Sequence, residues 1–133
     1  MRKLLVFAAA FVLAASAYAA EFPTITIDDL KTAMTKQKVV LLDANGTESW
    51  QNGHIPGAID FSANTEDLAT VLPQDKDVLV VAYCANPQCP AYRQAAVAAK
   101  KLGYKNIKHL TAGIQGWKNA GEKMEAGSAT SKT

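Results

Sequence analysis

Two short runs of consecutive apolar residues constrain the fold of this chain more than any other feature of its sequence. They are Val39–Asp43 (VVLLD) and Val78–Tyr83 (VLVVAY), and neither alternates with polar residues. Strands that are buried on both faces have this continuous character, and they occur in parallel sheets that are covered by helices on both sides. The sequence therefore predicts an α/β domain with a parallel sheet at its centre.

The remaining segments supply further strands and the helices that would cover the sheet. Further strands are expected at Thr24–Ile27, Ala58–Phe61 and Ile107–Leu110, which gives about five in total. Helices are expected at Asp28–Met34, Thr65–Leu72, Pro90–Leu102 and, as a short element, around Ile114–Asn119. Thr47 is predicted to be the N-cap of a short turn that contains Trp50. Pro90 suits the first helical position, and Gly103 can end the same helix in the left-handed conformation.

The start of the chain has the pattern of a secretory signal peptide. Arg2 and Lys3 precede the apolar stretch Leu4–Leu13, and Ala17 and Ala19 are small residues at the two positions that a signal peptidase reads. The apolar stretch is shorter than the ~20 residues of a membrane-spanning helix, so we expect cleavage after residue 19 rather than a retained anchor. We therefore expect export to a bacterial periplasm, with no membrane contact after cleavage.

Removal of residues 1–19 would leave 114 residues, the size of one ordinary globular domain. It would also remove two basic residues, so the basic count would fall from 14 to 12 and would equal the 12 acidic residues. A formally neutral chain without a basic stripe gives no indication of nucleic-acid binding. We expect the domain to span residues 20–121. Residues 122–133 (EKMEAGSATSKT) lack apolar periodicity and are expected to form a flexible tail.

Cys84 lies where the second apolar run ends, and a short loop leads from it into the alanine-rich segment Pro90–Leu102. We expect its thiol to be rigidly held, half exposed, and close to backbone N–H groups at the positive end of the following helix. Such a setting lowers a cysteine pKa from about 8.5 towards neutrality, and the thiolate is the nucleophilic form. Cys84 is therefore the predicted nucleophile.

Several spaced motifs, taken together, resemble a known family. They are Asp43-Ala44-Asn45, Trp50-Gln51-Asn52-Gly53-His54-Ile55-Pro56-Gly57-Ala58-Ile59, Tyr83-Cys84, Leu102-Gly103-Tyr104, Leu110-Thr111-Ala112-Gly113-Ile114 and Gly116-Trp117. The pattern looks like a single-domain rhodanese and covers the chain from Thr24 to Gly121. The resemblance implies a rhodanese-like α/β fold whose central parallel sheet has about five strands, flanked by helices on both faces. It also implies a nucleophilic cysteine that accepts sulfane sulfur as a persulfide, and by its place in the motif that cysteine is Cys84.

The activity implied by the resemblance is that of a thiosulfate or persulfide sulfurtransferase. Cys84 would take sulfur from a small donor and pass it to a thiol or a cyanide-like acceptor, without a metal or an organic cofactor. The expected substrate-binding loop consists of Ala85, Asn86, Pro87, Gln88 and Cys89, with Arg93 as the nearest cation. The N–H groups of this loop and the helix N-terminus would stabilise the developing negative charge. The sequence leaves open whether the domain also binds a protein partner.

The chain departs from the family pattern at positions that bear on the sulfur donor. An arginine is common in the family where Asn45 stands, and a glycine where Ala112 stands; we expect both changes to affect packing and stability. The active loop lacks the usual glycine and basic residue, and it resembles a longer variant in which a second cysteine recurs. Pro87 and Pro90 each remove an N–H group that could have bound an anion such as thiosulfate. The identity of the physiological sulfur donor is therefore left open. Pro90 also stands where a phosphatase loop needs its arginine, which argues against phosphatase chemistry.

Cys84 and Cys89 are the only two cysteines, and an exported protein meets an oxidising compartment. A disulfide across so short a loop would remove only about 2 kcal/mol of chain entropy from the unfolded state, which is little for a structural staple. We therefore predict that Cys89 is a resolving cysteine, which attacks a persulfide or sulfenic acid on Cys84 and forms a reversible disulfide. A zinc site with His54 and His109 is the rival, but the spacing is poor. His54 and the surrounding stretch Gly53–Gly57 are expected to form a structural turn.

Two classes of function stay open at this stage. The first is a sulfurtransferase with a persulfide on Cys84. The second is a non-catalytic or redox-responsive binding module of the rhodanese fold, which would use the Cys84 and Cys89 pair to contact a partner or to sense oxidants. Uptake of one sulfur atom by Cys84 would separate the two classes.

Overall fold

The computed structural model describes residues 22–127 of the 133-residue chain. The expected signal peptide, residues 1–19, and the last part of the expected tail, residues 128–133, lie outside the described residues. Within residues 22–127, no helix combines the length and the apolar character that crossing a membrane would require.

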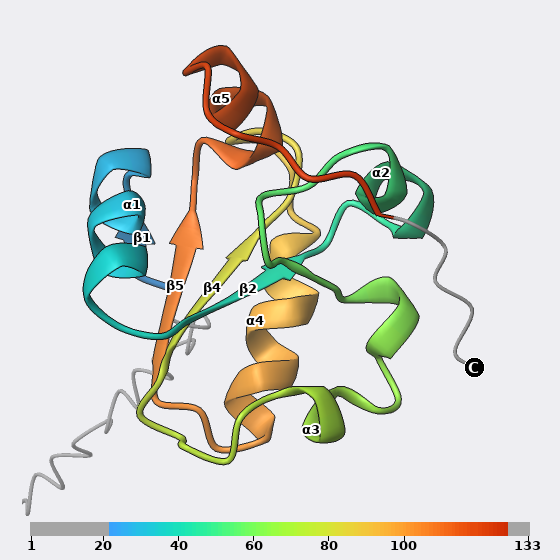
Figure 1. Ribbon diagram of the computed structural model, residues 1–133. Helices are drawn as coiled ribbons and strands as arrows, with labels where there is room; N and C mark the ends of the chain where they lie inside the picture. The colour runs from blue at the N-terminus through green and yellow to red at the C-terminus, as the bar shows by residue number, and fades with distance from the viewer. Residues whose placement is uncertain (1–21, 128–133) are drawn as a thin grey trace, which may run out of the picture.

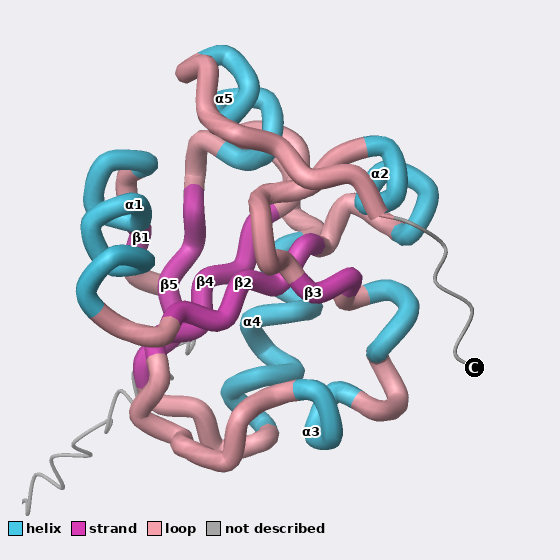
Figure 2. Tube along the Cα trace, viewed as in Figure 1, coloured by secondary structure: helices cyan, strands magenta, loops and turns pink. Residues whose placement is uncertain are grey.

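A five-stranded sheet forms the centre of the structure (Figure 1 and Figure 2). Its strands are β1 (Thr24–Ile25), β2 (Val39–Asp43), β3 (Ile59–Asp60), β4 (Leu79–Tyr83) and β5 (Asn106–Leu110). They lie in the order β1-β5-β4-β2-β3, and every neighbouring pair is parallel. The predicted parallel sheet, with the second apolar run at its centre, is confirmed.

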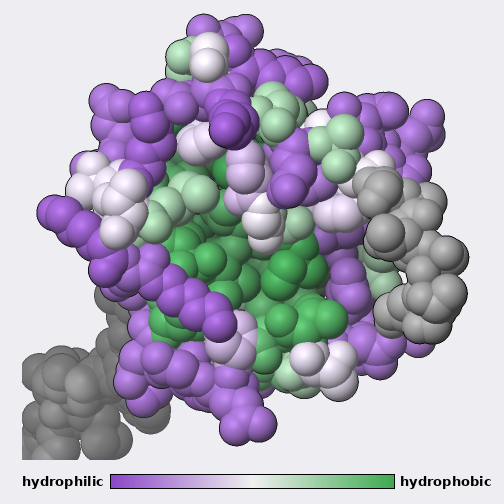
Figure 3. Space-filling model, in the orientation of Figure 1, coloured by the Kyte–Doolittle hydropathy of each residue, from purple (hydrophilic) through white to green (hydrophobic). Residues whose placement is uncertain are grey.

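Helices cover both faces of this sheet. They are α1 (Ile27–Lys36), α2 (Thr47–Asn52), the 3₁₀ turn η1 (Ser62–Asn64), α3 (Leu68–Val71), α4 (Tyr92–Lys101) and α5 (Gly113–Asn119). The helices α3 and α4 pack on one face, and α1 and α5 on the other. Figure 1 shows α4 behind the sheet, and Figure 3 shows a hydrophobic area at the centre of the opposite side, surrounded by hydrophilic residues.

The central strand β4 explains how side chains are distributed between the two faces. All five of its residues are buried. Odd-numbered residues, including Tyr83, join the core that contains α1 and α5, whereas even-numbered residues join the core that contains α4. Side chains of a strand alternate in this way because successive Cβ atoms point to opposite faces. Cys84, the next even-numbered residue, therefore lies on the α4 side.

Helix α4 begins later than the sequence predicted. Ala91 is its N-cap and Tyr92 is its first residue, so Pro90 lies outside the helix. The carbonyls of Pro90 and Ala91 accept hydrogen bonds from Arg93 and Gln94, three residues onward (3.1 and 3.2 Å). These bonds form a tighter turn ahead of the regular helix.

The middle and the end of α4 follow the prediction. Ala95, Ala96 and Ala99 are fully buried, so their small side chains allow the helix axis to lie close to the sheet. Gly103, which comes after the helix, has a φ of +97°. The left-handed residue predicted at this point is therefore confirmed.

Two other predicted helix starts are wrong. Gly46, rather than Thr47, is the N-cap of α2, and its φ of +94° is a conformation that glycine adopts without strain. The chain therefore turns into α2 one residue earlier than expected. The helix predicted at Thr65–Leu72 is reduced to α3, because residues 65–67 form turns. They follow η1, in which the Asp60 carboxylate accepts a hydrogen bond from the N–H of Ala63 (3.3 Å).

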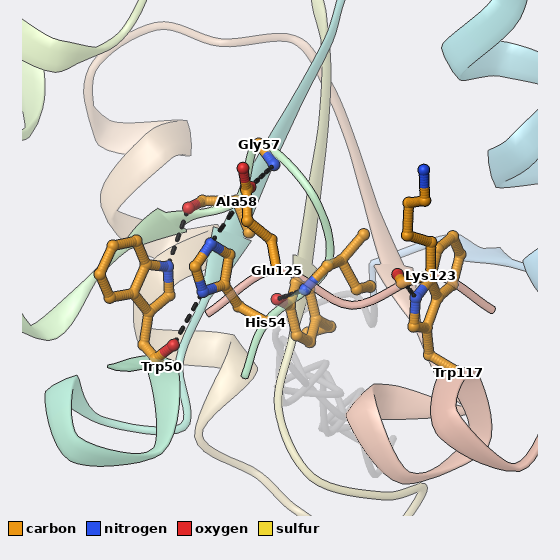
Figure 4. Close-up of polar contacts among 9 residues, drawn as sticks. Trp50, His54, Gly57, Ala58, Trp117, Lys123 and Glu125 are labelled. Atoms are coloured by element: carbon orange, nitrogen blue, oxygen red, sulfur yellow. Dashed lines mark hydrogen bonds and ion pairs between the residues drawn. The ribbon is translucent and has the colours of Figure 1, made fainter. Parts of the chain in front are cut away.

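The described part of the expected tail is attached to the domain. His54 and Glu125 form an antiparallel bridge, each donating its N–H to the other's carbonyl (2.9 Å in both directions). The indole N–H of Trp117 donates to the carbonyl of Lys123 (2.8 Å), as Figure 4 shows. The structure thus differs from the expectation of a loose tail for residues 122–127, because these residues satisfy polar groups of the domain that the sequence pattern did not reveal.

Candidate functional site

Cys84 lies directly after β4, at the carboxyl edge of the sheet, and its side chain packs against α4. Only 1% of its surface is exposed. The expected half exposure is therefore wrong, because the alternation of side chains along the strand directs this residue into the core with Tyr92 and Ala96. Its sulfur is shielded from solvent while the loop keeps this conformation.

A disulfide joins Cys84 to Cys89 across the loop, with Cα atoms 6.2 Å apart. Cys89 is partly exposed, unlike its partner. Neither sulfur is a thiol in this state, so neither titrates. A nucleophile at Cys84 exists only after this bond has been reduced.

Asn86 organises the loop between the two cysteines. Its side-chain Oδ1 accepts a hydrogen bond from the N–H of Gln88 (3.0 Å), and its carbonyl accepts one from the N–H of Cys89 (3.2 Å). Pro87 has no N–H to offer. Among residues 22–127, the N–H groups of Ala85 and Asn86 make no hydrogen bond. The ring of donors expected from residues 85–89 is therefore reduced to two in the disulfide state.

Helix α5 holds the other side of the loop. The N–H of Ile114 donates to the carbonyl of Cys84 (2.8 Å), and the N–H of Gln115 donates to the carbonyl of Ala85 (3.0 Å). The loop backbone comes so close that a Cβ on Gly113 would lie 2.6 Å from the carbonyl carbon of Ala85. Sequence reasoning did not assign this role to α5, although Gly113, with a φ of +64°, belongs to one of the motifs that were noted.

Asp43, at the end of β2, is a fully buried carboxylate next to the loop-bearing strand. Its Oδ1 accepts two hydrogen bonds from Asn45, one from the backbone N–H (2.7 Å) and one from the side-chain amide (2.9 Å). Burial raises the pKa of Asp43 above its ordinary value of 3.8, while Asn45 and the Tyr83 hydroxyl oppose this change. Asn45 therefore stabilises a buried carboxylate at the position where an arginine is common in the family.

The stretch Gly53–Gly57 forms a turn whose first three residues are buried. The Nδ1 of His54 donates to the carbonyl of Trp50 (2.7 Å), and the two rings are stacked with centroids 4.1 Å apart. The N–H of Ile55 donates to the Tyr83 hydroxyl (3.1 Å). Figure 4 shows Trp50, His54 and Glu125 side by side. These contacts give His54 a structural role.

Arg93, the predicted cation, lies in the first turn of α4 with its Cζ 5.9 Å from the centroid of the Tyr92 ring. The Tyr92 ring is stacked on that of His109, with centroids 3.4 Å apart. Arg93 and Cys89 line one hollow of about 270 Å³. The structure therefore brings the predicted cation and the second cysteine together. The stack of Tyr92 on His109 was not foreseen, because the two residues belong to different elements.

The rival zinc site finds no support in the described part of the chain. Within residues 22–127, no group of three or more His, Cys, Asp or Glu side chains could hold a metal ion. The two cysteines are bonded to each other, and His54 and His109 are each stacked on a different aromatic ring.

Sequence comparison links the chain to one family. The family model for the rhodanese-like domain matches residues 26–120. The HTH-type transcriptional regulator Rv0324 of Mycobacterium tuberculosis is 35% identical over 91 residues, which are 68% of this chain and 39% of that protein. The chain thus spans about two fifths of the length of this curated relative.

Solved structures share the fold. The BH2092 protein from Bacillus halodurans superposes with a TM-score of 0.68 at 25% identity, covering 79% of this chain and 77% of that one. The thiosulfate sulfurtransferase from Pseudomonas aeruginosa gives a TM-score of 0.58 at 21% identity, with 80% of this chain and 21% of that one covered. At this identity, the second likeness shows the fold alone.

Proposed function

The chain belongs to the rhodanese-like domain family, and on that premise we propose that it is a sulfurtransferase which carries sulfane sulfur as a persulfide on Cys84. The observation that carries the proposal is the position of this residue. Cys84 follows the central parallel strand, and its backbone is held by α5 while its side chain lies beside α4. In open parallel sheets, the carboxyl ends of the strands are where ligands bind.

The proposed cycle starts with reduction of the disulfide by an external thiol, which is itself oxidised to a disulfide and leaves Cys84 and Cys89 as thiolates. The Cys84 thiolate attacks the outer sulfur of a small sulfane donor; a new S–S bond forms, and the leaving group takes the electron pair of the donor's bond. The free N–H groups of Ala85 and Asn86 and the N-terminus of α4 stabilise the negative charge on the persulfide. A thiol or a cyanide-like acceptor then attacks the outer sulfur and returns Cys84 as a thiolate. The cycle needs no resident metal or organic cofactor.

Cys89 is proposed to be the resolving cysteine. Its thiolate attacks the inner sulfur of the Cys84 persulfide, so that the Cys84–Cys89 bond forms and hydrosulfide leaves with the electron pair. The same attack on a sulfenic acid at Cys84 releases hydroxide. The disulfide of the structure supports this proposal, because it shows that the loop can bring the two sulfur atoms together. A periplasmic location is proposed with it, since disulfides persist in oxidising compartments.

A donor screen with a mass readout tests the proposed activity. Reduced protein is incubated with thiosulfate or with a small persulfide, and its intact mass is measured. C89S should gain one sulfur atom, whereas C84S should gain none. In wild type the gain should be transient, because Cys89 then displaces hydrosulfide and the disulfide with Cys84 forms again. Absence of the gain in both wild type and C89S with every donor would contradict the proposal, and a gain that survives in C84S would assign the sulfur to another residue.

The second candidate is a redox-responsive binding module, and one observation favours it. Cys84 is almost fully buried and bonded to Cys89, so the resting site presents no nucleophile. The protein from Mycobacterium tuberculosis that is similar over 91 residues is named as a transcriptional regulator. In this reading, opening of the disulfide would change the surface of the loop for a protein partner. If neither wild type nor C89S takes up sulfur, but reduction of the wild type changes amide exchange at residues 85–91, this candidate is supported.

A further inference from the structure

The two edges of the sheet differ in charge. The segments that enter β2, β4 and β5 are residues 36–38, 72–78 and 100–105, and the segments that leave the same strands are residues 44–46, 84–91 and 111–112. The entering segments carry six lysines and two aspartates, whereas the leaving segments carry no charged residue. Because the strands are parallel, all entering segments lie at one edge of the sheet, which we call the amino edge (the lower side of Figure 1).

The lysines of the amino edge are Lys36, Lys38, Lys76, Lys100, Lys101 and Lys105. Three of them lie in the last turns of α1 and α4, where the negative end of a helix favours cations. Lys38, Lys76 and Lys105 lie outside the helices, so the helix ends do not account for them. Within residues 22–127, none of the six makes an ion pair, and all except the half-buried Lys76 are exposed. Their charges are therefore available to a partner.

A hollow of about 520 Å³ opens among these lysines. Lys100 and Lys105 line it together with the apolar or aromatic residues Phe22, Tyr104 and Ile107, and none of its described lining residues is acidic. Walls of this kind suit an anionic group that is attached to an apolar body. A phospholipid has this chemistry.

The start of the chain leads to the same edge. Phe22 precedes β1 and lines the hollow, so the residues before it join the domain at the amino edge. Only residues 14–21 separate Phe22 from the apolar stretch Leu4–Leu13, and eight extended residues span at most about 28 Å. A bilayer that holds the apolar stretch would therefore stay within about 28 Å of this edge. Cleavage after residue 19 would remove the apolar stretch and leave the lysines in place.

We propose that the amino edge binds the surface of a bilayer that contains anionic phospholipids, with its lysines next to the phosphate groups. The expectation of no membrane contact after cleavage rested on loss of the apolar stretch, and electrostatic contact does not need that stretch. Each lysine close to such a surface strengthens binding by about fivefold, and salt weakens the attraction. Cys84, at the opposite edge, faces away from the bilayer. The inference goes beyond the proposed function and does not rest on it.

Co-sedimentation with lipid vesicles tests the proposal. The chain without residues 1–19 is used, because it keeps every strand and helix of the domain and lacks the apolar stretch. It is mixed with vesicles made of equal parts of phosphatidylglycerol and phosphatidylcholine, or of phosphatidylcholine alone. It should bind the anionic vesicles at low salt, less at high salt, and should not bind the neutral ones. Equal binding to both kinds of vesicle, or binding to neither, would refute the proposal.

A pair of double variants with the same net charge tests the position of the surface. K100Q/K105Q should weaken binding to the anionic vesicles by about 25-fold, since two lysines are lost. K118Q/K123Q is the matched control, because these exposed lysines lie in α5 and the segment after it, beyond the carboxyl end of β5. The control should bind like the wild type, and equal losses in both variants would show that only net charge matters. Urea unfolding of both variants should stay close to that of the wild type, because the substituted residues are exposed.

The two tryptophans report the orientation on the bilayer. Trp50 and Trp117 lie in α2 and α5, which follow the carboxyl ends of β2 and β5. Brominated lipids quench nearby indoles, and they should leave the fluorescence of the bound protein unchanged. Strong quenching would contradict an orientation with the amino edge on the lipid. Binding to soluble dextran sulfate without binding to anionic vesicles would assign the edge to an acidic macromolecule and overturn the proposal.

Discussion

Two loops meet at the carboxyl edge of the sheet, and they are held in opposite ways. The turn Gly53–Gly57 is bonded to parts of the chain that are distant in sequence: His54 pairs with Glu125 through the backbone, and Ile55 donates to the Tyr83 hydroxyl. The loop from Cys84 to Ala91 is closed by a disulfide and by the hydrogen bonds of its own Asn86.

The difference shows where the molecule can change. The turn is held by hydrogen bonds and contains no disulfide that a reductant could open, so we expect its conformation to stay the same when the cysteines are reduced. The loop is anchored at its first two carbonyls by α5, and the rest of it is closed by a bond that a thiol can break. The proposed chemistry at Cys84 would therefore depend on a segment that α5 holds at one end and that reduction of the disulfide releases at the other.

The largest expected effect comes from breaking the anchor of the active loop with G113A. The new Cβ would lie 2.6 Å from the carbonyl of Ala85 and 2.7 Å from the N of Asn86, at a φ of +64°. We expect a loss of about 2–4 kcal/mol in the free energy of unfolding, from overpacking and from backbone strain. Urea unfolding measures it. G121A is the matched control, since Gly121 has a φ of +72° but nothing within 4 Å of the added Cβ, and equal losses in both variants would show that the loop is not packed against α5.

A smaller effect is expected from weakening the turn with Y83F. The variant removes the hydroxyl that accepts the Ile55 N–H and leaves a buried donor without a partner. The cost should be about 1–3 kcal/mol, measured by urea unfolding. Amide exchange of Ile55 should become faster, while the disulfide between the cysteines should be reduced at an unchanged rate. Unchanged protection of Ile55 would mean that the hydroxyl does not hold the turn.

The smallest effect concerns Asp43, which lies between the two loops. Its folded pKa is raised above 3.8 by burial, so the folded protein binds its proton more tightly than the unfolded chain does. The free energy of unfolding should therefore fall as the pH rises from about 3.8 through the raised pKa, and this fall should be absent in D43N. The comparison of wild type and D43N by urea unfolding from pH 4 to 7 measures the difference. A difference that stays constant over this range would contradict the raised pKa.

Parts of this fold could be predicted from local sequence alone. The run Val39–Asp43 is a strand with the predicted bounds, and Gly103 has the left-handed φ that ends a helix. In both cases the information lies in neighbouring residues: continuous apolar character marks a strand buried on both faces, and only glycine takes a positive φ without strain. The start of α4 at Tyr92 was missed, because the turn ahead of it depends on backbone bonds rather than on the residue at its first position.

The residues of the candidate site were proposed from the sequence, but their surroundings could not be predicted from it. Cys84, Cys89 and Arg93 were identified from their order along the chain. Two of the loop N–H groups that were expected to bind an anion donate to Asn86 instead, and Cys84 is buried. These features depend on which face of the sheet a side chain packs against and on which N–H group bonds to which acceptor. The spacing of residues in the sequence gives no information on either.

By itself, the sequence determined the class of fold, the family and the identity of the two sulfur atoms, because apolar runs and motif residues act through local propensity and burial. Only the tertiary structure decided that α5 would anchor the loop, that residues 122–127 would close over the turn, and that a hollow would open beside Cys89 rather than Cys84. These outcomes arise from contacts between segments far apart in the chain, and such contacts are set by packing geometry rather than by any one segment.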